Sequence, residues 1–164
     1  MARYGKIRNP WVGKDDYNCI GCAPNNPIGL HMHFYTDDDA VLGVMHPNEN
    51  FQGWIGMLHG GIQSTMLDET GAWFVGYRKQ MTAVTTRLDV RFMKPVLTSW
   101  ERILVRATGG TEGHGLCQVH LELLSPDGEV CARAEATYFM NPRPLQDDSL
   151  RVRYDIEAEY DALP

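Results

Sequence analysis

The sequence predicts an α+β fold in which one curved antiparallel sheet wraps around a single central helix. Three observations lead to this prediction. Residues 62–77 form the one long stretch with helical periodicity, and it is apolar nearly all round. Four later segments alternate apolar and polar residues with period two, and turn-forming residues join them, which favours antiparallel neighbours. A wholly apolar helix must be covered, and one sheet suffices to cover it.

Each element follows from a local pattern. Before the helix, the extended segments 30–35 and 41–45 are joined by a polar turn and are expected to form a hairpin. The helix is expected to end near Arg78 and Lys79, whose charges suit the negative end of its dipole. Glycine-rich residues 109–113 are expected to be a turn. The four strands after the helix are predicted at residues 84–92, 103–107, 117–123 and 130–138.

The domain organisation predicted from these patterns has three parts. Residues 1–28 form an N-terminal arm, because they contain three X-Pro turns and little periodicity. Residues 29–142 form the folded domain, and residues 143–164 form an acidic C-terminal tail. The tail is expected to be a solvated surface segment or a helix.

Composition excludes several classes of protein. A chain of 164 residues that is 43% hydrophobic and 22% charged is typical of one globular domain. A net charge of −6 and a longest basic run of two residues argue against a nucleic-acid partner. No segment has the roughly 20 apolar residues of a membrane span, and none resembles a secretory leader. Four cysteines are too few for a disulfide scaffold, so we expect a cytoplasmic protein with reduced thiols.

The start of the helix is the first candidate site. His59-Gly60-Gly61 immediately precedes the apolar stretch. The first turn of a helix has N–H groups without helical partners, and the dipole makes this end electropositive. Because glycine lets a ligand approach the backbone closely, this turn is a candidate oxyanion hole for a reacting carbonyl. The alternative is an ordinary turn from loop to helix.

The second candidate site is a pair of carboxylates in the middle of this helix. Asp68 and Glu69 interrupt its apolar run, and burying a charge is costly unless the charge is paired or belongs to a site. Helical spacing places Asp68 on a face of small side chains and Glu69 on a face with larger, core-facing ones. We therefore expect Asp68 to be the functional acid, and a salt bridge to a neighbouring arginine is the alternative for either residue.

The spacing between the two candidate sites has a consequence for assembly. Nine residues separate His59 from Asp68, which is about 13 Å along a helix. One carbonyl cannot contact both ends of this interval within a single helix. A two-fold dimer with antiparallel helices would bring Asp68 of one copy beside Gly60 and Gly61 of the other. The sequence thus predicts an obligate homodimer with two shared sites.

These residues resemble a known family, the hotdog-fold acyl-CoA thioesterases of the phenylacetate-degradation (PaaI-like) type. The resemblance covers roughly residues 17–140 and rests on three segments, FQGWIGMLHGGIQSTMLDE at 51–69, TTRLDVRFMKP at 85–95 and CIGCAPNNPIGL at 19–30. It implies a hotdog fold and hydrolysis of an acyl-CoA thioester to a carboxylic acid and free coenzyme A, with no other cofactor. Homodimers, with tetramers as dimers of dimers, are the assemblies it implies.

The resemblance also implies residue roles. The amide of Gly60 would polarise the thioester carbonyl, and Asp68 of the partner subunit would act as base or nucleophile. Thr85 would orient Asp68 or the water, and His59 would order the loop. Gln52 is the nearest candidate for holding the water or the carbonyl. The remaining expected substrate-binding residues are Gly61, Gly56 and Trp54, of which Trp54 is a candidate for the wall of an acyl tunnel.

Three alternatives remain at this stage. The same motifs would suit a non-catalytic acyl-CoA or acyl-carrier binding protein, or a hotdog dehydratase or hydratase. Cys19 and Cys22, with His31 and His33, have spacings that a zinc site would use. We expect no metal, because a second Cys-x-x-Cys pair is absent from the sequence, and we expect the thiols to be packing residues rather than nucleophiles.

Overall fold

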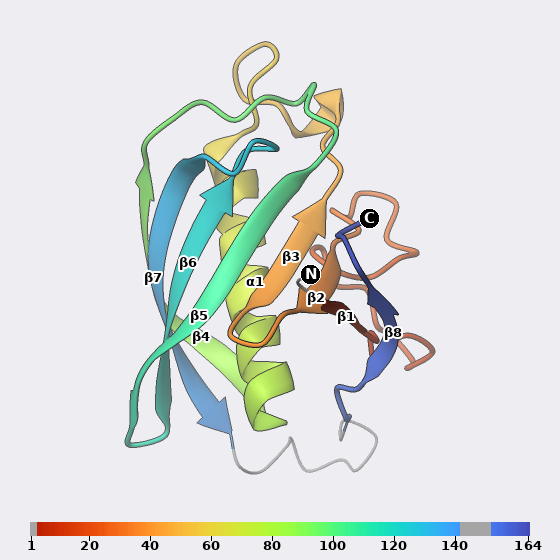
Figure 1. Cartoon of the computed structure of the whole chain (residues 1–164), viewed down its shortest axis with the longest axis vertical. Coiled ribbons are helices and arrows are strands. Elements are labelled where there is room, and N and C mark those ends of the chain that lie inside the picture. The colour runs from red at the N-terminus through yellow and green to blue at the C-terminus, as the bar shows by residue number, and fades with distance from the viewer. Residues whose placement is uncertain (1–2, 142–151) are drawn as a thin grey trace.

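The computed structural model describes residues 3–141 and 152–164, and it confirms the predicted hotdog fold. One antiparallel sheet curves around helix α1 (Gly60–Lys79), as Figure 1 shows. The sheet order is β4-β7-β6-β5-β3-β2-β1-β8. The strands are β1 (Tyr4–Ile7), β2 (His33–Thr36), β3 (Val41–Met45), β4 (Thr82–Phe92), β5 (Ile103–Gly113), β6 (Leu116–Leu124), β7 (Val130–Asn141) and β8 (Ile156–Tyr160), and a short 3-10 helix, η1 (Glu49–Phe51), precedes α1.

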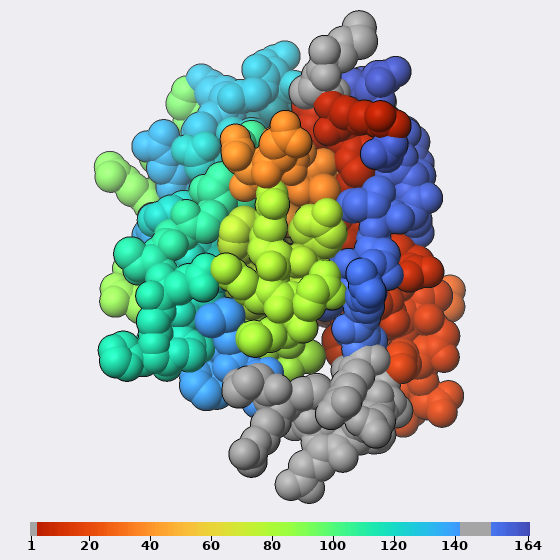
Figure 2. Space-filling view, turned by 60° about the horizontal axis from the view of Figure 1, so that its bottom comes forward, coloured from red at the N-terminus to blue at the C-terminus, as the bar shows by residue number. Residues whose placement is uncertain are grey.

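The concave face of the sheet covers the apolar surface of α1. Met66, Leu67 and Val75 have no exposed surface, and Trp73 stacks on Phe34 of β2 with ring centroids 4.0 Å apart. Alternate residues of β5, β6 and β7 complete this core, which explains the period-two pattern. At the C-terminal end of α1 the helix reaches the surface between the β5–β6 turn and the C-terminal segment (Figure 2). Within the described part of the chain, no helix is both long enough and apolar enough to cross a bilayer.

Both ends of the chain differ from the prediction, because each adds a strand to the sheet. β1 lies inside the expected arm and β8 inside the expected tail, and the two pair from Tyr4 opposite Tyr160 onwards. An ion pair between Lys6 and Glu157 (2.7 Å) supports this pairing. β8 is a strand and not the expected helix, but most of its residues are exposed, as expected for a solvated surface segment. β1 and β8 are too short to give a periodic signal in the sequence. The expected boundary between the folded domain and the tail, at 142–143, lies outside the described residues.

The connection between β5 and β6 also differs from the prediction. β5 continues through the glycine-rich residues 109–113, and the chain reverses at His114 and Gly115. Both turn residues have positive φ, 53° and 78°, which is what a two-residue type I′ hairpin requires. Between Gly109 and Glu112 the register shifts instead, so these glycines mark a bulge within the strand.

Strand β4 is an open edge of the sheet. It pairs with β7 on one side and, among the described residues, has no strand on the other. Apolar side chains on it face solvent, with Val84 64% and Phe92 50% exposed. Long, exposed, apolar edge strands are templates for pairing with another chain.

Candidate active site

The backbone at the start of α1 has amide donors without helical acceptors, and Gly60 is the first of them. His59 is the N-cap residue, and its Nδ1 accepts a hydrogen bond of 2.8 Å from the N–H of Gly61. Gly60 is the first helical residue, so its own N–H has no helical acceptor. The cap therefore occupies Gly61 and leaves the N–H groups of Gly60 and Ile62 without a hydrogen-bond partner among the described residues, and Gly60 has no side chain to hinder a ligand oxygen.

The loop before α1 holds this end of the helix in place. The N–H of His59 donates to the carbonyl of Phe51 (2.9 Å), and the N–H of Leu58 donates to the carbonyl of Val96 (2.8 Å). Phe92, at the end of β4, lies over the helix start, since its ring is 3.5 Å from the place that a Cβ on Gly60 would occupy. The first turn of α1 thus lies against the far end of the open edge strand.

The substrate-binding residues expected in this loop have mixed roles in the structure. Gln52 Oε1 accepts a hydrogen bond of 3.0 Å from the N–H of Gly56, so the Gln52 side chain closes the loop on itself. Gly56 has φ +76°, a conformation that side chains rarely adopt. Trp54 and Ile55 at the loop tip are 82% and 95% exposed. The loop therefore presents two large apolar side chains beside the helix start.

Asp68 lies in the middle of α1 and accepts two hydroxyl hydrogen bonds. Thr85 Oγ1 donates to Asp68 Oδ1 at 2.8 Å, and Tyr138 Oη donates to the same oxygen at 3.2 Å and to the Asp68 carbonyl at 2.8 Å. No described residue hydrogen-bonds Oδ2. One carboxylate oxygen is thus held by the protein, and the other is available to water or substrate.

Two local features bring these hydroxyls to Asp68. A bulge at Thr86 shifts the register between β4 and β7, and it leaves Thr85 directly opposite Tyr138. Gly71 makes room for the tyrosine, because a Cβ there would lie 2.1 Å from Tyr138 Oη. Burial raises the pKa of Tyr138, and the Asp68 charge adds to this effect, so its hydroxyl stays a donor.

Tyr138 is a site residue that sequence reasoning missed. It falls on the apolar face of β7 and is completely buried, as a core residue would be. The signal for its role is that a buried tyrosine hydroxyl needs a hydrogen-bond partner. Gly71, three residues after Asp68, marks the place where that hydroxyl fits.

Glu69 has a different environment from Asp68, although it is the next residue. Its Oε1 accepts a hydrogen bond from Trp73 Nε1 (3.1 Å) and lies 3.4 Å from Cys19 Sγ, and no arginine among the described residues pairs with it. Burial raises the pKa of Glu69 to about 7, and the negative charge of Cys19 adds to this effect. Within this helix the raised carboxylate pKa is therefore that of Glu69, which faces the N-terminal arm.

Cys19 and Cys22 are close to Glu69 but differ from each other. A hydrogen bond from Cys22 is the largest cause that lowers the pKa of Cys19 to about 5. The same hydrogen bond and burial raise the pKa of Cys22. His31 and His33 are not part of this cluster, and His31 Nε2 instead lies 2.6 Å from the carbonyl of Asn26. The side chains that the sequence pairs in a possible zinc site are therefore not brought together.

Comparisons with known proteins agree with this architecture. An uncharacterized protein of Schizosaccharomyces pombe is 29% identical over 145 residues, which are 83% of this chain and 81% of that protein. No model of a protein family matches the chain.

Solved structures of thioesterases share the fold at low sequence identity. A thioesterase of Haemophilus influenzae superposes with a TM-score of 0.61 at 17% identity, over 68% of this chain and 79% of its own. A hypothetical thioesterase of Streptococcus pneumoniae, crystallised with coenzyme A, gives a TM-score of 0.58 at 17% identity, over 63% and 82% of the two chains. The chain thus has the hotdog fold that thioesterase-superfamily structures share.

Proposed function

We propose that the protein is an acyl-CoA thioesterase that works as a homodimer with two shared active sites. The observation that carries the proposal is that Thr85 and Tyr138 orient the carboxylate of Asp68 by hydrogen bonds. The helix that contains Asp68 also begins with the free amide of Gly60. An amide at a helix start suits the oxyanion of acyl transfer. An oriented carboxylate with one unengaged oxygen suits activation of water. The thioesterase structures of the same fold, one of them with coenzyme A, support this chemistry.

The open edge of the sheet supports the dimer. α1 and β4 run in opposite directions, so Thr85 lies near Asp68 and Phe92 lies near Gly60. If two copies of β4 pair antiparallel about a two-fold axis near Leu88 and Asp89, Thr85 of one copy lies opposite Phe92 of the other. This pairing covers the exposed apolar side chains of the edge and brings Asp68 of the partner subunit toward Gly60.

In the proposed reaction the thioester carbonyl oxygen accepts a hydrogen bond from the N–H of Gly60. Asp68 of the partner subunit takes a proton from a water molecule, whose oxygen forms a bond to the carbonyl carbon. The carbon–sulfur bond then breaks, and the thiolate of coenzyme A leaves and takes up a proton. The products are a carboxylic acid and a free thiol. We expect Trp54, which is exposed at the loop tip, to contact the acyl group.

The proposal is tested by free-thiol release from a panel of acyl-CoAs, with a protein-only blank because the chain has four cysteines of its own. The informative variant is Gly60→Pro. Proline is favoured at the first position of a helix, where it removes the N–H and places a ring carbon on that nitrogen. His59 is already extended, as a residue before proline should be. We expect turnover to fall by about a hundredfold or more, as when an oxyanion donor is removed.

Gly60→Ala is the matched control, because it keeps the N–H and its Cβ would lie at an ordinary 3.5 Å from Phe92. We expect it to retain most of the activity. Acyl-CoA binding without turnover in the unmodified protein would instead indicate a binding protein. Hydration or dehydration of the acyl chain without thiol release would indicate a dehydratase.

Sharing of the sites is tested by mixing two inactive variants. In a heterodimer of Gly60→Pro with Asp68→Asn, one of the two sites has both an intact Gly60 and an intact Asp68. Random assembly from equal amounts should therefore recover about a quarter of the unmodified activity. No recovery after confirmed subunit exchange would show that each site lies within one chain.

A further inference from the structure

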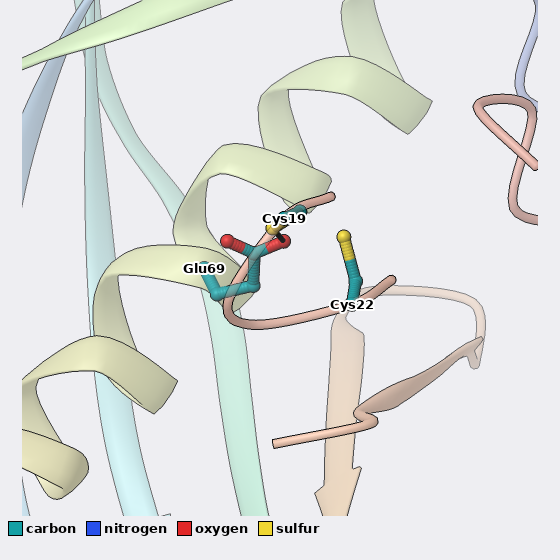
Figure 3. Close-up of side chains that lie close together, drawn as sticks. All are labelled: Cys19, Cys22 and Glu69. Atoms are coloured by element: carbon teal, nitrogen blue, oxygen red, sulfur yellow. Dashed lines mark hydrogen bonds between the residues drawn. The ribbon is translucent and has the colours of Figure 1, made fainter. Parts of the chain in front are cut away.

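The N-terminal arm and α1 together form a cluster of potential metal ligands, on a face of the helix about 100° round from that of Asp68. Cys19 and Cys22 come from one loop of the arm, and Glu69 comes from the middle of the helix, as Figure 3 shows. One ligand atom of each residue lies within 4.8 Å of the other two. A tetrahedral zinc ion holds sulfur and oxygen ligands about 3.5 Å apart, so small side-chain rotations suffice to bring these three atoms to one ion.

The loop between the two cysteines is shaped around the carboxylate. The N–H of Gly21 donates to Cys19 Sγ (3.3 Å), an arrangement that stabilises a thiolate. The carbonyls of Ile20 and Gly21 accept hydrogen bonds from Leu30 (2.7 Å) and Met32 (2.9 Å), which fix the loop on the next segment. A Cβ on Gly21 would lie 2.6 Å from the carboxyl carbon of Glu69, so only glycine allows this close approach.

The charges of the cluster favour a cation. Glu69 is partly buried and, among the described residues, has no lysine, arginine or histidine as an ion-pair partner. A partly buried carboxylate beside two thiols is electrostatically uncompensated unless the groups are protonated or a cation is bound. The polar side chains beside the cluster are the neutral residues Tyr17 and Asn9. Tyr17 Oη lies 2.9 Å from Cys22 Sγ and accepts a hydrogen bond from Asn9 Nδ2.

A cavity beside the cluster provides space for a further ligand. It has a volume of about 270 Å³, and Cys19, Cys22 and Glu69 all line it. The rest of its lining is aromatic, aliphatic or hydroxyl-bearing, with no basic side chain. Solvent in this cavity can therefore reach the point at which the three ligand atoms converge.

We propose that Cys19, Cys22 and Glu69 bind a zinc ion, with a solvent molecule from the cavity as the fourth ligand. Two thiolates and a carboxylate match the donors that zinc prefers, whereas the hard ions magnesium and calcium prefer all-oxygen sites. Binding releases the thiol protons, and any carboxyl proton, to solvent, and no group is oxidised. The ion would fasten the arm to α1 next to Asp68 and would take no part in hydrolysis.

This proposal replaces the sequence-based expectation of no metal. The zinc site considered from the sequence combined the two cysteines with His31 and His33, which are close in sequence but lie outside the cluster. The third ligand of the proposed site instead comes from a helix about 50 residues further along the chain.

The experiment uses metal-free protein prepared under reducing conditions. Zinc is titrated against a chromophoric chelator, and cobalt(II) is titrated separately as a spectroscopic probe. We expect one zinc per chain and, with cobalt, the sulfur-to-metal charge-transfer absorption of thiolate ligands. Cys19→Ser and Glu69→Gln should each weaken zinc binding by at least about tenfold. Cys131→Ser is the matched control, because Cys131 is on β7 outside the cluster and should leave the affinity unchanged.

The cobalt spectrum of the unmodified chain does not depend on whether any variant folds. Absence of stoichiometric zinc binding at micromolar concentrations would overturn the proposal, as would a cobalt spectrum without thiolate bands. Equal zinc affinity in the unmodified chain and in folded Glu69→Gln would overturn the assignment of the carboxylate. A mass lower by two hydrogens in the reduced-buffer protein, showing a Cys19–Cys22 disulfide in place of metal, would also contradict it.

Discussion

Asp68 and Glu69 are consecutive residues of one helix, yet they belong to different parts of the molecule. Successive helical residues point about 100° apart, so Asp68 faces β4 and β7 while Glu69 faces the N-terminal arm. Asp68 is oriented by two hydroxyls, and Glu69 lies between an indole N–H and two thiols. A carboxylate in an apolar helix therefore marks a site, but only its long-range neighbours determine the chemistry of that site.

The two carboxylates should differ most in how much their substitution lowers turnover. Asp68→Asn keeps the shape of the side chain but removes its ability to accept a proton from water. We expect turnover of the best acyl-CoA substrate to fall by a factor of about 10² to 10⁴, with acyl-CoA binding retained. In Glu69→Gln we expect a decrease at least ten times smaller, because Glu69 faces away from the reacting groups. Equal losses in the two folded variants would contradict the proposed division of roles.

The second effect concerns the thiols on the Glu69 side and their dependence on pH. A thiol with a lowered pKa is ionised above that value, so metal-free Cys19 should be mostly thiolate above about pH 5. Its alkylation by iodoacetamide should therefore rise through pH 5 and be nearly constant by pH 7. At pH 6.5 we expect it to be at least about tenfold faster than alkylation of the buried Cys22, Cys117 and Cys131, whose pKa values are raised.

Mass spectrometry of the alkylated peptides measures this difference. Cys22→Ser is the informative variant, because the hydrogen bond from Cys22 is the largest cause of the lowered Cys19 pKa. In Cys22→Ser the rise in the rate of Cys19 alkylation should move to higher pH. Alkylation of Cys19 that begins only above pH 8 in the unmodified chain would contradict the prediction.

The smallest effect concerns the orientation of Asp68. Tyr138→Phe removes the hydrogen bonds to the Asp68 carbonyl and to Oδ1 but leaves that of Thr85. We expect the free energy of unfolding to fall by about 1 kcal/mol, the usual net contribution of a hydrogen bond. Turnover should fall only several-fold. Denaturant titration and thiol release measure the two effects. A loss of turnover as large as that of Asp68→Asn would mean that the tyrosine takes part in the chemistry itself.

The elements with strong local signals were predictable from the sequence. Helix α1 and strands β4 to β7 follow from periodicity, and the structure extends most of them by only a few residues. The predicted position of the β5–β6 turn was wrong. Residues 109–113 are glycine-rich and resemble a turn, but the turn is formed by the two residues His114 and Gly115. Turn geometry depends on φ values that composition does not specify.

The parts that depend on distant contacts were not predictable. Thr85 was expected beside Asp68 through the family resemblance alone, since 17 residues separate them. The position of Tyr138 is that of a core residue, and its role appears only when β7 is placed over Gly71. Cys19 and Glu69 are 50 residues apart, and no periodic pattern connects an irregular loop with a helix.

The pairing of β1 with β8 has a consequence for how the chain folds. Tyr4 and Tyr160 are neighbours in the sheet although about 150 residues of chain separate them. The hairpins of β5, β6 and β7 close short loops, whereas the β1–β8 pair must close nearly the whole chain and therefore contributes strongly to a high contact order. Pulse-labelling hydrogen exchange during refolding should show protection of β5 to β7 first and of β1 and β8 last, so the metal-binding arm would be ordered only after the helix it contacts.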